Sequence, residues 1–414
     1  MTMANSLKNE SQGLSFKICK KILDNLNHGS LSLSFNQQVY VFGDIDDQGP
    51  HASVNIHDKK VFTRFLLGGT IAAGETYMEG LWDSPNLSTL TQLFSANIAR
   101  SSTKRSWLEK PTQLALRVAN KVTENSLRGS RKNIKAHYDL GNDLFENFLD
   151  PSMMYSSAIY PSKEATLEQA QQYKLQRICQ KLDLKPTDHL LEIGTGWGAM
   201  AIYAAQHYGC NVTTTTLSDE QFSLTQERVR ALNLEDQITL LKTDYRELSG
   251  QFDKVVSIEM IEAVGHGFMP GYFKKIDQLL TPKGVALLQC ITIADQRYEQ
   301  YRQSVDFIRK YIFPGGHLPS VSVIHTHIAQ QTSMLVTHFE DISLHYARTL
   351  HDWDKAFVEN YAKLPSEKYD ERFFRMWRYY LAYCEGGFKE QAIGTHQIVF
   401  TKPQFHKEWT AIVR

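Results

Sequence analysis

The sequence predicts an α/β protein in which a doubly wound, Rossmann-like sheet follows a smaller N-terminal α+β domain. Strand-like and helix-like segments alternate from about residue 185 onward, which is typical of the βαβ units that build a mostly parallel sheet. A glycine-rich turn, "GTGWG" at 194–198, directly follows the first of these strands. The chain has 414 residues, which exceeds one ordinary core and predicts at least two domains.

The N-terminal region, residues 1–99, has a pattern of its own. Three short segments alternate apolar and polar residues, as half-buried strands do. These segments are 30–35, 38–43 and 52–58. The stretch 61–94 then has the pattern of helices interrupted at Gly68, Gly69 and Gly80. We therefore predict a separate α+β domain in this region.

Residues 100–135 form a basic segment between this domain and the doubly wound domain at 136–414. It has ten Lys or Arg residues against Glu109 and Glu124, with apolar side chains such as Trp107 between them. Two interpretations stay open. The segment is a solvated linker helix, or it is a surface for anionic lipid headgroups, where each positive charge contributes about 1 kcal/mol.

The composition argues against several classes of protein. Lys and Arg total 45 and Asp and Glu total 45, so a dedicated nucleic-acid binder is not expected. The sequence has no run of 18 apolar residues that would span a membrane, and its N-terminus lacks the apolar core of a signal peptide. The five cysteines are scattered without a CxxC pair, which indicates reduced thiols in a cytoplasm and no structural metal.

The doubly wound domain is predicted element by element from its apolar patterns. Strands are expected at 189–194, 211–218, 237–245, 252–259 and 284–293, helices at 198–209, 219–234 and 269–280, and a late antiparallel strand at 395–403.

The glycine turn itself allows two ligands. Gly194-x-Gly196-x-x-Ala199 passes a relaxed dinucleotide fingerprint. However, Glu192 and Gly198 complete E-x-G-x-G-x-G, the methyltransferase form, in which the loop faces the amino-acid part of S-adenosylmethionine.

The second strand supports the methyltransferase reading. A dinucleotide-binding fold has an acidic residue at the end of this strand, where this sequence has only Thr213–Thr216. Asp244 follows the third strand, where methyltransferases often contact the adenine. The sequence therefore predicts a class I methyltransferase sheet that binds S-adenosylmethionine, rather than a dinucleotide or no ligand.

Three further motifs are specific to one family. They are "HYDLGNDLFENFLDPSMMYSSAIYPSKEATLEQAQQYK" at 137–174, "SIEMIEAVG" at 257–265 and "RKYIFPGGHLPS" at 309–320. With the order of the parts, they closely resemble the cyclopropane-fatty-acyl-phospholipid synthases and the related mycolic acid cyclopropane synthases. The resemblance runs from about residue 60 to the C-terminus and is strongest at 136–320.

The resemblance implies an enzyme that transfers a methylene group from S-adenosylmethionine to the cis double bond of an unsaturated phospholipid acyl chain. The alkene would take the methyl group, and bound bicarbonate would deprotonate the resulting carbocation to close the ring. A dry, aromatic site with an anion suits such a cation. The resemblance also implies a lipid-binding or dimerisation role for residues 1–99, a possible homodimer, and peripheral docking at the inner face of the membrane.

Four catalytic positions match the resembled family. Glu262 matches the acid that orients the bicarbonate, and the hydroxyl of Tyr346 completes the pocket. Backbone groups at Ile291 match those that touch the ion, and Cys384 matches a C-terminal cysteine near the same site. A nucleophilic role for Cys384 is not expected, because a lone cysteine usually packs as a small hydrophobic residue.

Three positions depart from the family. Ser157 stands where the family commonly has cysteine, and Gln289 and Ala263 each replace a histidine. A glutamine can donate to an anion but cannot carry a proton near neutral pH. We expect the ring still to form, while the alternative is a C-methyltransferase that leaves a methyl or methylene branch. A non-catalytic lipid-binding protein is a third reading, and the glycine loop argues against it.

The resemblance also assigns the cofactor contacts. The methionine end is assigned to Tyr155 and Ser156, the glycine loop to Glu192, Gly194, Gly196 and Gly198, the ribose to Thr216, Leu217 and Gln221, and the adenine to Asp244 and Tyr245.

Overall fold

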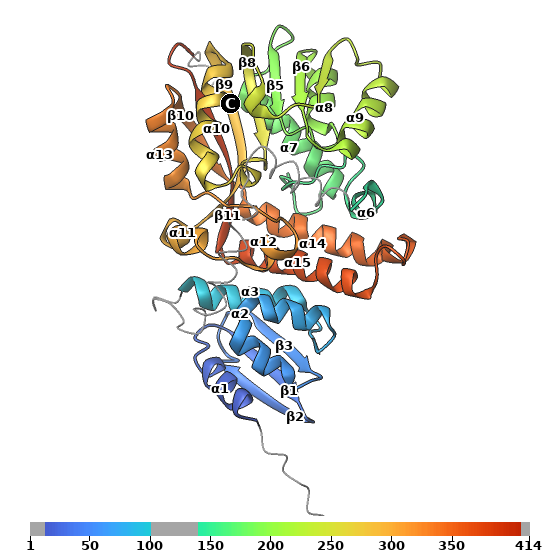
Figure 1. The fold of residues 1–414 in the computed structure, drawn as a ribbon, viewed down its shortest axis with the longest axis vertical. Coiled ribbons are helices and arrows are strands. Elements are labelled where there is room, and N and C mark those ends of the chain that lie inside the picture. The colour runs from blue at the N-terminus through green and yellow to red at the C-terminus, as the bar shows by residue number, and fades with distance from the viewer. Residues whose placement is uncertain (1–12, 101–139, 407–414) are drawn as a thin grey trace, which may run out of the picture. The chain divides into compact units, whose positions relative to one another are not determined.

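The computed structural model describes residues 13–100 and 140–406, which fold into two compact units (Figure 1). The first unit comprises 13–100 with Asp370–Gly386, and the second comprises 140–369 with 387–406. The basic segment predicted at 100–135 lies outside the described residues, apart from Arg100 at the end of a helix.

The first unit has a four-stranded sheet in the order β2-β1-β3-β4. Its strands are β1 (Ser30–Phe35), β2 (Gln38–Gly43), β3 (His51–Ile56) and β4 (Trp82–Asp83), and its helices include α1 (Leu14–Leu23), α2 (Lys60–Met78) and α3 (Leu87–Arg100). β1 pairs antiparallel with β2 and parallel with β3. The rings of Phe16, Phe35 and Phe62 pack against one another in its core. The predicted strands of this region are thus all present.

The placement of helix α15 (Glu371–Lys389) differs from the domain boundaries predicted from the sequence, which assigned all of 136–414 to one domain. Most of α15 belongs to the first unit. The physical reason is a set of hydrogen bonds: the Arg375 guanidinium donates to the carbonyls of Tyr77 and Trp82, and the Thr91 hydroxyl donates to the carbonyl of Ala382 at 2.6 Å. The first unit is therefore completed by a segment from near the C-terminus.

The second unit is built on a seven-stranded sheet in the order β10-β11-β9-β8-β5-β6-β7. Its strands are β5 (His189–Ile193), β6 (Asn211–Thr215), β7 (Ile238–Leu241), β8 (Phe252–Ile258), β9 (Leu280–Ile293), β10 (Leu335–Asp341) and β11 (Ile393–Thr401). The strands from β7 to β9 are parallel, whereas β11 is antiparallel to both β9 and β10. The predicted doubly wound sheet and its late antiparallel strand are confirmed. The strand β10 was not predicted.

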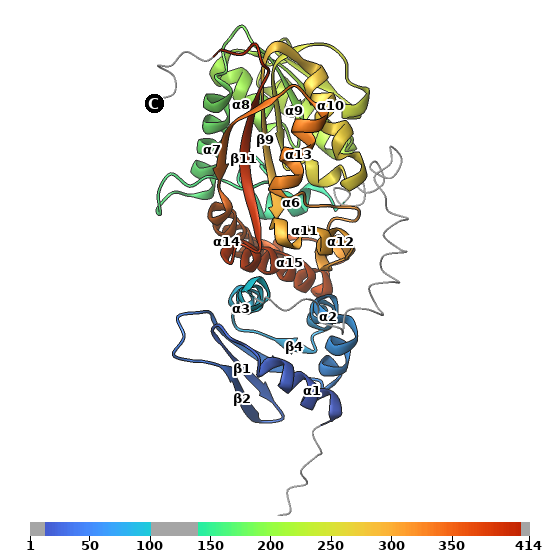
Figure 2. The same ribbon diagram turned by 90° about the vertical axis from the view of Figure 1, so that its left-hand side faces the viewer.

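Helices cover both faces of this sheet (Figure 2). The helices of the unit are α6 (Asn142–Phe148), α7 (Leu167–Leu182), α8 (Ala199–Tyr208), α9 (Asp219–Ala231), α10 (Met269–Leu279), α11 (Asp295–Arg302), α12 (Phe307–Tyr311), α13 (Val321–Gln331) and α14 (Ser343–Asn360). One core joins α7, α8 and α9 to the sheet, and a second core joins α10 and α13 to its other face. Within the described residues, no helix is both long and apolar enough to cross a bilayer.

Several of these helices begin where the sequence provides a side-chain cap. The Thr166 hydroxyl accepts from the backbone N–H of Gln169, whose side chain accepts in return from the N–H of Thr166, so a capping box starts α7. The Ser218 hydroxyl similarly accepts from the N–H of Gln221 at the start of α9. These caps fix the chain on either side of the strand ends where the pocket lies.

Candidate active site

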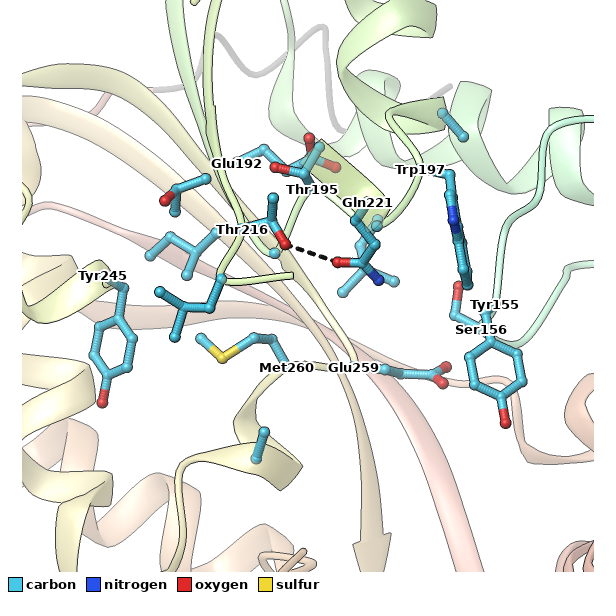
Figure 3. Close-up of a pocket in the computed structure, with 18 of the residues that line it drawn as sticks. Tyr155, Ser156, Glu192, Thr195, Trp197, Thr216, Gln221, Tyr245, Glu259 and Met260 are labelled. Carbon is cyan, nitrogen blue, oxygen red and sulfur yellow. Dashed lines mark hydrogen bonds between the residues drawn. The ribbon is translucent and has the colours of Figure 1, made fainter. Parts of the chain in front are cut away.

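A pocket opens at the carboxyl ends of the parallel strands, beside the glycine loop (Figure 3). The structure brings together there ten of the eleven residues predicted to contact the cofactor. They are Tyr155, Ser156, Glu192, Gly194, Gly196, Thr216, Leu217, Gln221, Asp244 and Tyr245. The position of the pocket agrees with the rule that open α/β sheets bind ligands at this edge.

The glycine loop keeps the floor of the pocket open. Gly194, Gly196 and Gly198 have φ values of 99°, 53° and 88°, which side-chain-bearing residues rarely adopt. A Cβ at Gly196 would meet no atom within 4 Å, so a side chain there would occupy open space rather than packed core. A Cβ at Gly198 would lie 2.8 Å from Thr225 of α9, so this glycine serves helix packing. Gly198 is the predicted cofactor residue that does not line the pocket.

Glu192, one residue before the end of β5, is a buried acid with a hydroxyl partner. Its Oε2 accepts from the Thr214 hydroxyl at 2.6 Å, and Thr214 is joined in turn to the Thr195 hydroxyl at 2.7 Å. Burial raises the pKa of the Glu192 carboxyl to about 8. A positively charged ligand group beside this acid would lower that pKa again and favour the ionised form.

The wall formed by β6 and α9 offers hydroxyl and amide groups instead of an acid. The Thr216 hydroxyl donates to Oε1 of Gln221 at 2.7 Å, as Figure 3 shows. The same hydroxyl oxygen accepts from the N–H of Ser218 at 3.1 Å. Both side chains are therefore held in place at the position predicted to contact the ribose.

Asp244 lines the pocket, but its carboxylate already has a cationic partner. Arg246 donates from Nε to Oδ1 at 2.8 Å and from its terminal nitrogen to Oδ2 at 2.7 Å. This paired geometry fixes the loop that follows β7. Neighbouring Tyr245 lies edge-on to Tyr272 with 5.3 Å between ring centroids. The two residues predicted to hold the adenine thus form one firmly supported wall.

A second acid, Glu259, was missed by the sequence analysis. It directly follows β8, lines the pocket and is partly exposed to it. Its Oε1 accepts from the N–H of Ser157 and from Nε2 of Gln289, each at 2.9 Å, and its Oε2 accepts from the Tyr346 hydroxyl at 2.7 Å. Three residues predicted to hold an added anion therefore hold Glu259. The signal was present in "SIEMIEAVG", which has two acids of which only Glu262 was singled out.

Glu262 and Ile291, both assigned to the same ion by the resemblance, contact each other directly. The N–H of Ile291 donates to Oε1 of Glu262 at 2.5 Å, while Oε2 is buried and has no hydrogen-bond partner among the described residues. Burial and the neighbouring Glu259 raise the pKa of Glu262 to about 8. Of these two neighbouring acids, Glu259 lines the pocket and Glu262 does not.

Of the other predicted positions, Cys384 lies in α15, in the part of that helix that belongs to the first unit. Ala263 lines the pocket. Lys174, which was not predicted, is fully buried and donates from Nζ to the Ser156 hydroxyl at 2.7 Å. Burial lowers the pKa of Lys174 to about 7, and the negative charges of Glu259 and Asp150 oppose this shift.

Aromatic rings surround the part of the pocket near Glu259. Tyr155 lies beside Glu259 in Figure 3. Its ring contacts those of Phe145 and Trp353, with centroid distances of 5.2 Å in both cases. Trp353 is in turn edge-on to Tyr346 at 6.0 Å. The site therefore combines apolar rings with an anionic group, which is an environment that favours a short-lived cation.

The seven-stranded order, the antiparallel strand β11 next to the edge strand and the glycine-loop pocket define a class I methyltransferase fold. A solved mycolic acid cyclopropane synthase, in complex with SAH and CTAB, superposes with a TM-score of 0.62 at 31% identity, over 66% of this chain and 98% of that one. The family described as mycolic acid cyclopropane synthetase matches residues 125–398. The chain belongs to this family and is a methyltransferase.

Two curated relatives match most of the chain. The cyclopropane-fatty-acyl-phospholipid synthase of Escherichia coli K12 is 37% identical over 354 residues, which is 85% of this chain and 88% of the relative. The tuberculostearic acid methyltransferase of Mycobacterium tuberculosis is 36% identical over 363 residues, or 86% of this chain and 84% of the relative. The resemblance inferred from the sequence motifs is confirmed.

The glycine loop yields a direct prediction. Replacing Gly196 by Val should weaken binding of S-adenosylmethionine by roughly 100-fold or more, equivalent to about 3 kcal/mol, because the side chain enters the open space of the pocket. Isothermal titration calorimetry with S-adenosylhomocysteine measures this. Gly69→Val is a matched control, since Gly69 has a similar φ of 56° and a Cβ there also meets no atom, but it lies outside the pocket. Normal affinity in a folded Gly196→Val protein would refute the assignment.

Proposed function

We propose that the protein transfers a methylene group from S-adenosylmethionine to a cis double bond in an unsaturated phospholipid acyl chain, forming a cyclopropane ring. The observation that carries this proposal is the meeting of a glycine-lined pocket with an aromatic wall and a carboxylate that faces the pocket. The likeness to a cyclopropane-fatty-acyl-phospholipid synthase over most of both chains supports the same substrate class.

The residues present fit the cofactor. Gly196 leaves open space above the loop, and Glu192, Gln221 and Thr216 present an acid, an amide and a hydroxyl at its rim. When bound, S-adenosylmethionine supplies an electrophilic methyl group to the π electrons of the alkene. The chain itself positions the double bond, keeps water away from the reacting carbons and stabilises positive charge through the ring of Tyr155.

The residues present do not fit the bicarbonate that the resemblance implies. The donors assigned to that ion belong to Ser157, Gln289, Tyr346 and Ile291, and all four donate instead to side-chain carboxylates. A further anion placed among them would lose these donors and lie against like charge. The proposed reaction therefore does not include bicarbonate.

A methyl- or methylene-branched product is the second candidate. The likeness to a tuberculostearic acid methyltransferase at 36% identity favours it, as do Gln289 and Ala263, which stand where the resembled family commonly has histidine. Both reactions begin with the same methyl transfer to the alkene. They differ in how the carbocation then loses its charge: formation of a C–C bond closes the ring, whereas the other route leaves a branch.

Product analysis separates these two functions. With vesicles of a cis-monounsaturated phospholipid and methyl-labelled S-adenosylmethionine, we expect the acyl chain to gain one CH2 unit and to show the upfield proton signals of a cyclopropane. Mass spectrometry and proton NMR measure this. An equal mass gain with vinylic methylene signals would identify the methylene branch.

We also propose the inner leaflet of the membrane as the partner surface, with a homodimer as the assembled form. The support is chemical: an acyl double bond lies inside a bilayer, and the basic segment at 100–135 carries ten positive against two negative side chains. Such a segment attracts anionic headgroups and loses that attraction as salt screens it. Sedimentation measurements would test the homodimer.

The docking proposal predicts salt-dependent vesicle binding. Replacing Lys104, Arg105 and Lys110 together by Gln should weaken binding to anionic vesicles on the order of 10–100-fold at low salt. Flotation or surface plasmon resonance measures the change.

The control is a triple variant in which Lys163, Lys283 and Lys363 of the second unit are replaced by Gln. It loses the same number of positive charges. If both triple variants bind alike, or if neutral and anionic vesicles bind the wild type equally, the basic segment is a linker.

A further inference from the structure

We infer that Glu259 is the built-in base of this enzyme, accepting the proton that leaves the newly added methyl group. The inference rests on the proposed function, because it needs an acyl alkene as substrate. It replaces the added anion that the family resemblance implies by a side chain of the protein itself. Four observations carry it.

The first observation is position. Glu259 directly follows β8 at the carboxyl edge of the sheet, and it lines the same pocket as the glycine loop, Tyr155 and Ser156. In Figure 3 its carboxylate points toward Tyr155 and Ser156. The group therefore faces the space where the cofactor's methyl group and the substrate must meet.

The second observation is the way the carboxylate is held. One oxygen accepts two N–H groups and the other accepts a phenol hydroxyl, which is the bonding pattern of an ionised carboxylate. The donors are themselves fixed: Ser157 donates from the backbone, and the Tyr346 ring stacks on Phe388 at 4.5 Å. The site thus holds the carboxylate as it would hold a small planar anion.

The third observation is backbone strain. Glu259 has a φ of 50°, in the left-handed region that a long side chain rarely adopts, while its N–H donates to the carbonyl of Gln289 at 2.8 Å. Glycine would adopt this conformation without strain. An acid in a position that suits glycine points to a role for the side chain in the site.

The fourth observation is the charge around it. Lys174 is the buried cation next to the cluster. Other titratable groups near the pair are Asp150, Glu262, Cys290 and Tyr346. Burial raises the pKa of Glu259, while its three hydrogen bonds and the charge of Lys174 oppose the rise. A carboxylate with a raised pKa is a better proton acceptor near neutral pH.

The step balances without any further reagent. After methyl transfer, the neighbouring alkene carbon lacks an electron pair. Glu259 takes a proton from the new methyl group, and the electron pair of the broken C–H bond forms the C–C bond that closes the ring. If a hydride has first moved to that carbon, the same deprotonation leaves a methylene branch. The proton passes from Glu259 to water once the product has left.

The test is turnover with and without bicarbonate. Wild-type enzyme, S-adenosylmethionine and vesicles of an unsaturated phospholipid are combined in buffer freed of carbon dioxide, and bicarbonate is added to half of the samples. We expect equal turnover in both. A wild type that turns over only with bicarbonate would overturn the inference and leave the proposed function standing. A wild type that forms no modified lipid in either buffer would overturn the proposed function.

Two variants at the same position sharpen this test. Glu259→Gly suits the observed φ and opens an anion-sized space, so it should bind S-adenosylhomocysteine normally and lose about 100-fold or more in turnover without bicarbonate. Added bicarbonate or formate should restore much of that turnover. Glu259→Gln fills the space without a charge, so it should be equally slow and should not be restored.

Two outcomes would reject Glu259 as the base. One is full turnover of both Glu259 variants in the buffer free of carbon dioxide. The other is restoration by bicarbonate in Glu262→Gly but not in Glu259→Gly, which would assign the role to Glu262. Because the readout is dependence on an added anion, a purely structural role of Glu259 would not reproduce the expected result.

Discussion

The hydrogen bonds that converge on the Glu259 carboxylate are the interaction on which the rest of the site depends. Their donors come from three separate parts of the second unit: Ser157 from the segment before α7, Gln289 from β9 and Tyr346 from α14. Removing the acceptor would break these three hydrogen bonds together, which is costly for largely buried groups. Three segments that are distant in the sequence are therefore joined at one carboxylate.

The orientation of Gln289 is set by residues outside the pocket. A lysine ammonium can only donate, so Lys181 requires the Gln397 amide to present its oxygen. Gln397 must then donate from Nε2 to Oε1 of Gln289, at 2.8 Å, which leaves Nε2 of Gln289 to donate to Glu259. This series of hydrogen bonds from α7 through β11 to β9 thus selects one of the two orientations of the Gln289 amide. The carboxylate of Glu259 accepts the last hydrogen bond of the series.

Most of the fold could be predicted from the sequence, because buried parallel strands and capped helices leave strong local patterns. The edge strand β10 could not be predicted, since all of its residues are exposed or partly exposed and no apolar run marks it. The grouping of α15 with the first unit depends on contacts such as Arg375 with Tyr77, which are distant in sequence. The cofactor wall was predicted because its residues follow strands in a fixed motif. Glu259 was missed because its role depends on three donors up to 102 residues away.

A base fixed to the chain also makes the three departures from the resembled family compatible with one another. If Glu259 accepts the proton, the residue at 289 needs only to donate a hydrogen bond, and the Gln289 amide does so without titrating. Position 157 needs only a backbone N–H, which Ser157 supplies as any residue but proline would. Ala263 removes a second titratable group from the pocket wall. Each departure takes away a group able to carry a proton, and none removes a donor to the carboxylate.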